Sequence, residues 1–387
     1  MKFLYGINTN GQGHINRSRV FISELITDGH EVHVFLSGKQ PPRYAYELAD
    51  RVFYKQGPFD LYQDNKVLFS KSIQANINKF PEYNKARKEI VELDYKENYD
   101  AFFCDFEQTT SIAGKRLNKP VIVIDRQHAI FHSFCADKVP RKVYDKFAFR
   151  LALVALVPYY SKCFALDFTD SIHTKDDVTL FPLVKKPEFD NYDITYDNHI
   201  VAYLGRYNQT YVVDVLSKFP DETFYLYGFN EDKRVGNVVF RKTSREGFIE
   251  DLVSCKAIIG NGGFNLAWEA SLLNKLVWTI PHWKILEQVT NAYSLYELGL
   301  GYISEDLTEE DFVSFLDWAE ELNYKSDYKL RTLPASDLLS DVYDFLEDYQ
   351  AENYLKKRQI KRSIRYDLSR WRMRKEIKNE VKWKIEV

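Results

Sequence analysis

Short apolar segments alternate with segments of helical spacing along the first third of the chain. Residues 2–7 and 31–36 have the composition of strands, and residues 15–28 between them carry apolar side chains at helical spacing. Two more apolar runs, at residues 101–106 and 121–125, enclose a segment of helical composition. Such an alternation is typical of an α/β domain with a mostly parallel sheet.

A polar segment rich in turn-forming residues, 187–198, interrupts this pattern. A second alternation of strands and helices begins with HIVAYLG at residue 199 and continues to GYIS, which ends at residue 304. Because this run would make a doubly wound domain by itself, we place a domain boundary between residues 190 and 191. The chain is therefore predicted to fold as two facing Rossmann-like domains, 1–190 and 191–345, with a cleft between them.

The remaining residues, 346–387, form a basic tail. Residues 351–387 contain 13 Lys and Arg against 5 Asp and Glu, a local charge of +8. On a helix, the apolar residues of this tail would line up as one stripe on a basic surface. The stripe fits a helix packed on the body of the protein and an interfacial helix on anionic lipid equally well. Its residues are Ile360, Ile364, Leu368 and Trp371.

Length, charge and cysteine content narrow the class of protein. The 387 residues suit two domains, and a net charge of −3 gives no basic field of the kind that nucleic-acid binding needs. The apolar N-terminal run stops at Gly6, and the longest uncharged apolar run, 151–157, is far shorter than the roughly 20 residues of a membrane-spanning helix. The four cysteines are scattered, without metal-binding spacing. We expect a cytoplasmic protein with reduced thiols and no nucleic-acid partner.

Gly11-Gln12-Gly13-His14 stands where the first strand turns into the first helix. Glycines there let a ligand approach the backbone, and a helix N-terminus favours negative charge. The spacing is not that of a dinucleotide fingerprint, and a plain tight turn explains the glycines equally well. His14, however, would face the carboxyl edge of the sheet, where α/β proteins bind ligands. It could take the proton of an acceptor hydroxyl there.

Polar residues also follow the next two strands. Because parallel strands bring their carboxyl ends together, we expect an acid, an amide and a histidine to converge near the first helix. The alternative for each single acid is a helix cap, in which the carboxylate bonds only the free N–H groups of the following helix. AFFCDFE supplies Asp105 and Glu107, and VIVIDRQH supplies Asp125, Gln127 and His128.

The second domain contains the longest motif, IIGNGGFNLAWEA, at residues 258–270. A strand runs into a Gly-Gly turn and then a helix, so the free N–H groups of residues 263–265 could bind a diphosphate. Glu269, one turn inside the helix, could accept hydrogen bonds from the two hydroxyls of a ribose. The motif therefore predicts a site for a nucleotide.

Two further strand ends would complete this site. Glu287 and Gln288 follow the strand that ends near Pro281, and a carboxylate and an amide suit sugar hydroxyls. Gly205 and Arg206 follow HIVAYLG and would place a guanidinium near a phosphate. The pattern predicts a nucleotide-sugar site without the lysine of a P-loop.

The second-domain motifs resemble the donor-binding segment of inverting GT-B glycosyltransferases. GNGGFNLAWEA and IPHWKILEQVTNAYSLYELGLG are similar to that segment in one group of these enzymes. The group contains the lipid-linked N-acetylglucosaminyltransferase of peptidoglycan synthesis, the diacylglycerol glycosyltransferases and the plant UDP-sugar transferases. In the first domain, GQGHINRS, CDFE and IDRQH resemble an uncharacterised bacterial and archaeal branch of that superfamily. The resemblance spans residues 1–303 and implies a GT-B fold.

The resemblance also implies roles for individual residues. His14 would be the general base, and Asp105 and Glu107 are the nearest candidates for its acidic partner. On the donor side, the resemblance implies that Gly262, Gly263 and Phe264 form the phosphate turn. Glu269 would bind the ribose, and Glu287 and Gln288 would face the donor sugar. Asn265 joins the donor side through its free N–H group at the helix start. Gly13, Gln127 and His128 would lie on the acceptor side.

The implied reaction is a single displacement. A hexose-type sugar would move from a UDP-sugar to a hydroxyl of a lipid or lipid-linked glycan, without a metal ion or other cofactor. The basic tail would hold the protein on an anionic membrane, at the inner face of the cell membrane. Two other classes stay open on the residues alone. These are a nucleotide-sugar epimerase of the two-domain type and a non-catalytic nucleotide-sugar-binding protein on the same fold.

Overall fold

A computed structural model describes residues 1–59, 62–63, 66–67, 69–140, 143–175, 177–205, 207–242 and 244–351. The predicted tail stripe and Arg206 lie outside these residues. Arg141 and Lys142, two of the basic residues that precede the apolar run 151–157, also lie outside them. Within the described ranges, no helix combines the length and the apolar character that crossing a membrane requires.

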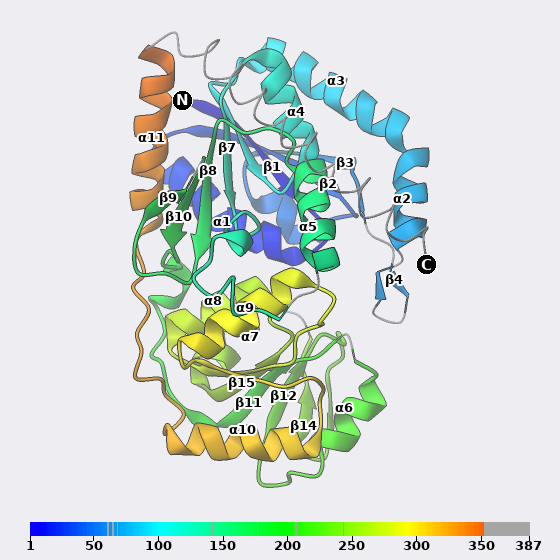
Figure 1. Ribbon diagram of the computed structural model, residues 1–387, viewed down its shortest axis with the longest axis vertical. Helices are drawn as coiled ribbons and strands as arrows, with labels where there is room; N and C mark the ends of the chain where they lie inside the picture. The colour runs from blue at the N-terminus through cyan, green and yellow to red at the C-terminus, as the bar shows by residue number, and fades with distance from the viewer. Residues whose placement is uncertain are drawn as a thin grey trace.

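The first half of the chain forms a sheet covered by helices on both faces (Figure 1). Its strands are β1 (Lys2–Asn8), β2 (Glu31–Gly38), β3 (Arg51–Gln56), β6 (Ala101–Asp105), β7 (Val121–Asp125), β8 (Lys162–Asp167), β9 (His173–Lys175) and β10 (Val178–Pro182). Their spatial order is β3-β2-β1-β6-β7-β8-β10-β9, and every neighbouring pair is parallel except β9–β10 at the edge. The central strands are almost entirely apolar because helices cover both of their faces.

The helices of this half connect the strands. They are α1 (Gln12–Thr27), α2 (Phe69–Asn78), α3 (Phe80–Glu97), α4 (Gln108–Leu117) and α5 (Val143–Leu156), with the short 3₁₀ helices η1 (Arg43–Glu47) and η2 (Ala129–Phe131). A small hairpin is made of β4 (Tyr62–Gln63) and β5 (Lys66–Val67).

The second half repeats the plan with a seven-stranded sheet in the order β13-β14-β12-β11-β15-β16-β17. Its strands are β11 (Asp197–Tyr203), β12 (Phe224–Tyr227), β13 (Lys233–Val235), β14 (Val238–Phe240), β15 (Cys255–Gly260), β16 (Leu276–Thr279) and β17 (Gly301–Ile303). All pairs are parallel except β13–β14 at the edge. The helices are η3 (Pro187–Phe189), α6 (Gln209–Leu216), α7 (Arg245–Ser254), α8 (Phe264–Leu273), α9 (Leu286–Glu297), α10 (Glu309–Glu321) and α11 (Ala335–Ala351).

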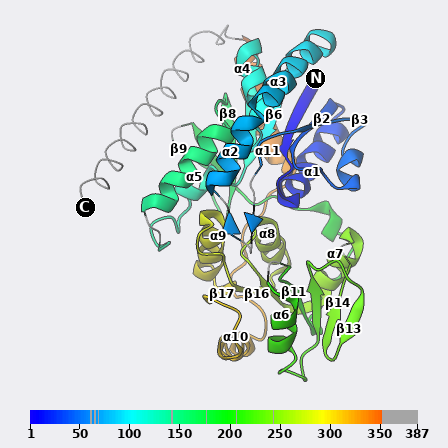
Figure 2. The ribbon, with the colours of Figure 1, turned by 90° about the vertical axis from the view of Figure 1, so that its right-hand side faces the viewer.

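The predicted α/β class with two doubly wound halves is confirmed. Figure 2 shows the two units stacked, with α8 and α9 of the second unit directly against the first. An apolar cluster joins them: Ile130, Cys135 and Val139 of the first unit pack with Leu286 and Val289 of α9. The predicted boundary near residue 190 falls between η3 and β11.

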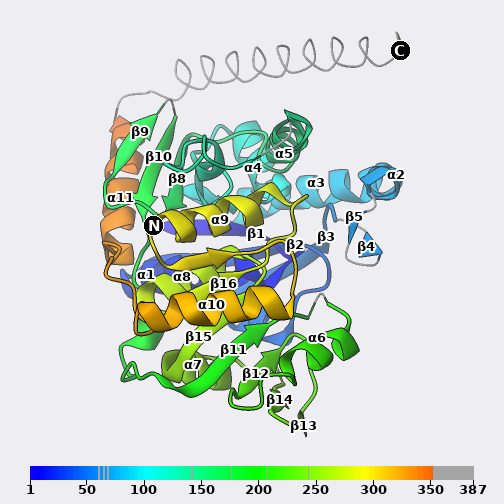
Figure 3. The same cartoon turned by 60° about the horizontal axis from the view of Figure 1, so that its bottom comes forward.

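The chain crosses between the units twice, and the two crossings are bonded to each other. Val184 on the first crossing forms a parallel bridge with Leu333 on the second. Beyond the second crossing, α11 returns to the first unit and packs on α1, as Figures 1 and 3 show. The Tyr343 hydroxyl there donates to Asp28 Oδ2 at 2.5 Å. The last described helix therefore covers the first sheet although it follows the second in sequence.

Gly6 lies in the middle of β1, beneath the start of α4. A Cβ atom there would lie 2.5 Å from Thr110 Cγ2 and 2.9 Å from Glu107 Oε2, too close for nonbonded atoms. We expect Gly6→Ala to lower the free energy of unfolding by about 1–3 kcal/mol in urea denaturation, the usual cost of overpacking a core. Gly11→Ala is the control, because nothing lies within 4 Å of its added Cβ. Equal stability of Gly6→Ala and the wild type would contradict the packing of α4 on β1.

Candidate functional site

Two helix N-termini meet where the units face each other. Helix α1 follows Gly11 and α8 follows Gly263, and neither of these N-cap residues bonds the helix through a side chain. The side chain of Asn265 in α8 donates from Nδ2 to the carbonyl oxygen of Gly13 in α1 at 2.9 Å. Free N–H groups and aligned peptide dipoles give both helix starts a positive potential. This junction is therefore suited to an anionic ligand.

His14, in the first turn of α1, forms a close pair with Asp105 at the end of β6. The distance from His14 Nδ1 to Asp105 Oδ1 is 2.7 Å. The imidazole stacks on the Phe106 ring, with centroids 5.6 Å apart, and the His14 side chain is 16% exposed. Because an ionised carboxylate only accepts hydrogen bonds, the contact with Asp105 requires the proton on Nδ1. Arg17 Nη2 lies 3.0 Å from the same nitrogen, and its two hydrogens then go to Asp105 and Gln127 instead. His14 Nε2 is then the nitrogen that can accept a proton from a substrate.

Asp105 is completely buried and is held by more than His14. Arg17 donates from Nε to Asp105 Oδ2 at 2.9 Å and also contacts Oδ1, and the Ser18 hydroxyl donates to Oδ2 at 2.9 Å. Burial alone would raise the pKa of Asp105, but the charges and hydrogen bonds of Arg17 and His14 outweigh it and lower that pKa to about 2. Asp105 is thus a carboxylate at neutral pH. The sequence interpretation missed Arg17 and Ser18, although they lie three and four residues after His14, on the same helix face.

Glu107, the other acid considered for His14, lies elsewhere. It is the N-cap of α4, where its carboxylate accepts from the backbone N–H groups of Thr109 and Thr110, both at 2.7 Å. The Glu107 side chain is buried by these contacts. The structure therefore brings Asp105 to His14 and leaves Glu107 in the helix-cap arrangement that the sequence had left open.

Of the polar residues after β7, two pair with each other and one contacts the His14 cluster. Asp125 accepts from the backbone N–H of His128 at 3.1 Å and lies 2.7 Å from His128 Nδ1, so these two buried residues satisfy each other. Gln127 instead joins the site: its Oε1 accepts from Arg17 at 3.1 Å, and its Nε2 donates to Glu287 of α9 at 3.2 Å. Gln127 thus connects the His14 cluster to the second unit.

Gln288, beside Glu287, supports its own loop. Its Oε1 accepts from the backbone N–H of His282 at 2.9 Å. Its carbonyl oxygen would lie 2.6 Å from a Cβ at Gly262, which also has a positive φ of 69°. Only glycine fits the turn at that position. Glu287 therefore faces the first unit, while Gln288 shapes the glycine turn at Gly262.

A second contact between the units fixes this turn. Asn291 of α9 donates from Nδ2 to the Gly262 carbonyl at 3.1 Å, and Asn291 Oδ1 accepts from Nε of the buried Arg126 at 3.0 Å. The guanidinium groups of Arg126 and Arg17 each lie 5.6 Å from the Phe264 ring centroid. The sequence interpretation assigned no site role to Arg126 or Asn291, although both are within motifs that it quoted.

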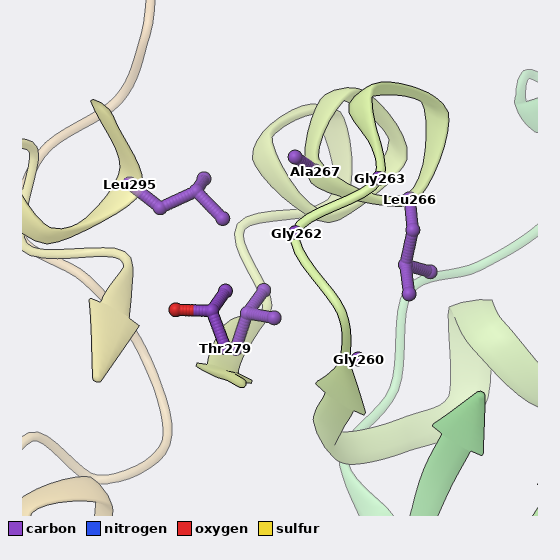
Figure 4. Close-up of a pocket in the computed structure, with 8 residues that line it drawn as sticks. Gly260, Gly262, Gly263, Leu266, Ala267, Thr279 and Leu295 are labelled. Atoms are coloured by element: carbon purple, nitrogen blue, oxygen red, sulfur yellow. The ribbon is translucent and has the colours of Figure 1, made fainter. Parts of the chain in front are cut away.

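Figure 4 shows a small hollow beneath the turn. Apart from the Thr279 hydroxyl, the side chains that line this hollow are apolar, so they offer no set of side-chain donors for a phosphate. It reflects the packing of α8 on β15 and β16. The lining residues are Gly260, Gly262, Gly263, Leu266, Ala267, Val277, Thr279 and Leu295.

Glu269 is buried and paired with two cations. Its Oε1 lies 2.6 Å from Lys186 Nζ and 2.9 Å from Arg245 Nη2. Burial would raise the pKa of Glu269, but the charges of Lys186 and Arg245 outweigh it and lower that pKa. The sequence predicted the carboxylate on α8 and missed both cations, which come from other elements.

Gly205, predicted beside the donor, follows β11 and packs directly on the backbone of Gly228. Arg206 lies outside the described residues, so the predicted guanidinium stays a prediction.

Two clusters within the described ranges have the geometry to hold a metal ion. One is the buried group Asp125, His128 and Cys163, and the other is Glu31, His33 and Glu97. In the second, Lys2 already binds both carboxylates. Neither cluster includes a residue of the glycine turn or of α8.

Comparisons with known proteins agree with this architecture. A sequence model described as glycosyl transferase family 1 matches residues 1–319. Comparison with curated protein sequences gave no match. Among solved structures, the calicheamicin glycosyltransferase CalG4 has a TM-score of 0.56 at 14% identity, covering 89% of this chain and 98% of its own. SnogD from Streptomyces nogalater has a TM-score of 0.54 at 16% identity, with coverages of 89% and 99%.

The spinosyn forosaminyltransferase SpnP is similar too, with a TM-score of 0.57 at 11% identity over 90% of this chain and 99% of its own. At such identities the likeness shows the fold, and it confirms the predicted GT-B arrangement of two facing units. The family model covers most of the chain, including the His14 pair and the glycine turn. The chain therefore belongs to glycosyl transferase family 1 and is a glycosyltransferase.

Proposed function

We propose that this glycosyltransferase moves a hexose-type sugar from a nucleotide-diphosphate sugar, with UDP as the nucleotide, to an acceptor hydroxyl with inversion at the anomeric carbon. One observation carries the proposal. His14, paired with Asp105, lies in the first turn of α1, and Asn265 in the first turn of α8 bonds the backbone of the neighbouring Gly13. His14 as a base and the start of α8 as an anion site would then act on the same substrate. The similar structures of VinC and of the rhamnosyltransferase SpnG are complexes with dTDP and thymidine diphosphate, which supports a nucleoside diphosphate here.

In the proposed reaction, Nε2 of His14 accepts the proton of the acceptor hydroxyl. The acceptor oxygen forms a bond to the anomeric carbon on the face opposite the nucleotide, while the bond from that carbon to the β-phosphate oxygen breaks. The electron pair of the broken bond leaves with the diphosphate. Asp105 stabilises the imidazolium, and the N–H groups at the start of α8 stabilise the leaving group. This scheme assigns no step to a metal ion or other cofactor.

The donor would lie along α8. Gly263, Phe264 and Asn265 would offer backbone N–H groups to the diphosphate, and Glu269 would accept from the ribose. Glu287, which already meets Gln127 across the units, would bind hydroxyls of the transferred sugar. Gln288 would act through the shape of the turn, since its side chain bonds its own loop.

For the acceptor we propose a lipid or lipid-linked glycan, reached from the inner face of the cell membrane. The +8 segment at residues 351–387 supports this, as does α5. Leu151 and Leu153 of α5 are only partly buried, and Lys146 and Arg150 precede them. Apolar surface beside basic residues suits anionic lipid. Another apolar acceptor is an outcome of the test, because the similar SpnG is also a complex with spinosyn aglycone.

The reaction is tested by measuring UDP release from UDP-sugars with and without lipid acceptors and apolar aglycones. We expect release that depends on an acceptor. Conversion of the donor to another UDP-sugar would indicate an epimerase, and binding without release would indicate a non-catalytic protein. Product anomers read by NMR would decide between inversion and retention.

His14→Ala should lower turnover by about 10²–10⁴, the usual contribution of a general base, because the acceptor hydroxyl keeps its proton. Calorimetry should give an unchanged dissociation constant for UDP, since His14 lies on the acceptor unit. Gln12→Ala, an exposed neighbour in the same turn, is the matched control and should keep nearly full turnover. If the His14 variant kept most of the activity, His14 would not be the general base and would only form part of the turn.

Glu269→Gln should weaken UDP binding about 10- to 100-fold. A hydrogen bond to a charged group contributes about 1.5–3 kcal/mol, and the amide presents an NH2 donor to the ribose in place of the acceptor Oε2. Glutamine keeps the shape and one oxygen for Lys186 and Arg245, and circular dichroism would confirm the fold. An unchanged dissociation constant in calorimetry would remove Glu269 from the nucleotide site.

The tail is tested by vesicle co-sedimentation of the full chain and of a chain ending at Ala351. We expect the full chain to bind anionic vesicles more strongly than the shortened chain, which keeps only α5. High salt should release much of the full chain, because surface charges are screened over about 8 Å at physiological ionic strength. Neutral vesicles are the control. Equal binding by both chains, or no preference for anionic lipid, would favour an acceptor in solution.

A further inference from the structure

Lys186 is buried on the first crossing between the units, just after Val184. Its side chain is 1% exposed, and Nζ lies 2.6 Å from Glu269 Oε1 and 4.4 Å from the centre of the Trp268 ring. The Trp268 indole also donates to the Val184 carbonyl oxygen at 2.8 Å. The crossing segment is therefore fastened to two successive residues of α8, through an ion pair and a hydrogen bond.

Arg245, at the start of α7, reaches the same carboxylate oxygen from another direction. Its Nη2 donates to Glu269 Oε1 at 2.9 Å, and its Nε donates at 3.3 Å to Glu188, which is also on the crossing segment. Every hydrogen bond and ion pair of Glu269 in the described part of the chain uses Oε1. Oε2 has no partner among the described residues, and the Glu269 side chain keeps 3% of its surface exposed.

Two cations on one oxygen fix the plane of the carboxylate. A glutamate side chain on a helix otherwise turns freely about its last torsion. With Oε1 held by Lys186 and Arg245, Oε2 is directed away from both and keeps its full capacity to accept hydrogen bonds. The two neighbouring hydroxyls of a ribose supply two such donors.

We propose that Lys186 is a positioning residue for the donor: it holds Glu269 so that Oε2 accepts the ribose hydroxyls. Because Lys186 belongs to the crossing segment, recognition of the ribose depends on how the two units are joined. The inference rests on the proposed function, in particular on Glu269 as the ribose ligand. It adds a residue whose sequence context, a lysine before a proline in a polar linker, gave no sign of this role.

The test compares binding of UDP and 2′-deoxy-UDP by calorimetry in the wild type and in Lys186→Met. Methionine keeps the aliphatic contact with Trp268, and Arg245 still balances the charge of Glu269. The wild type should bind UDP at least about tenfold more tightly than 2′-deoxy-UDP, because one hydrogen bond to a carboxylate is lost with the hydroxyl. In Lys186→Met this ratio should fall to about two, while the affinity for inorganic pyrophosphate changes less than about twofold.

Lys185→Met is the matched control, because Lys185 is exposed and adjacent, and it should keep the wild-type ratio. Lys186→Gln provides a second variant without the ammonium, in case methionine lowers the melting temperature below that of the assay. A wild-type ratio in either folded Lys186 variant would overturn the inference. An equal loss of affinity for UDP, 2′-deoxy-UDP and pyrophosphate would also overturn it, since that pattern marks a general structural defect.

Failure of the proposed function gives different results. A wild type that binds neither nucleotide would refute the nucleotide donor itself. A wild-type ratio in Glu269→Gln would remove Glu269 as the ribose ligand, and the inference would fall with it. Loss of the ratio in Glu269→Gln but not in the Lys186 variants would refute only the role of Lys186.

Discussion

The carboxyl ends of the two parallel sheets face each other, and the rest of the site depends on this orientation. In a parallel sheet each strand leads into a helix whose N-terminus lies at the carboxyl edge. Helices α1 and α8 therefore begin on opposite sides of one interface, where Asn265 bonds the backbone of Gly13. His14 in the first turn of α1 and the free N–H groups at the start of α8 therefore lie at the same interface. Neither unit alone would bring these groups together.

The negative charges of the buried acids at this interface are compensated by neighbouring side chains. Asp105 is surrounded by His14 and Arg17, and Glu269 by Lys186 and Arg245. An unpaired carboxylate in such an environment would be destabilising by several kcal/mol. Because each negative charge is compensated locally, the positive potential of the helix starts is left for a ligand. The same pairs keep both acids ionised and fix their orientation.

Much of the fold followed from local pattern. The alternation of apolar strands and helices predicted both sheets, because a strand covered on two faces must be apolar along its whole length. The glycine turn before α8 was also predicted, since a positive φ and a close backbone contact at Gly262 admit only glycine. The rule that parallel strands end together placed Asp105 near His14. It could not separate Asp105 from Glu107, because both follow the same strand and the choice depends on side-chain direction.

The sequence by itself determined the two α/β halves, the helix starts and the residues that occupy them, because these depend on neighbours within a few positions along the chain. Only the tertiary structure decided which side chains meet across the halves. From the sequence, Lys186 belongs to a linker and Arg126 to the end of a strand. In the structure Lys186 pairs with Glu269, and Arg126 bonds Asn291. Their partners lie 83 and 165 residues away. Ion pairs and hydrogen bonds over such separations depend on how the two sheets dock, and no local spacing encodes that.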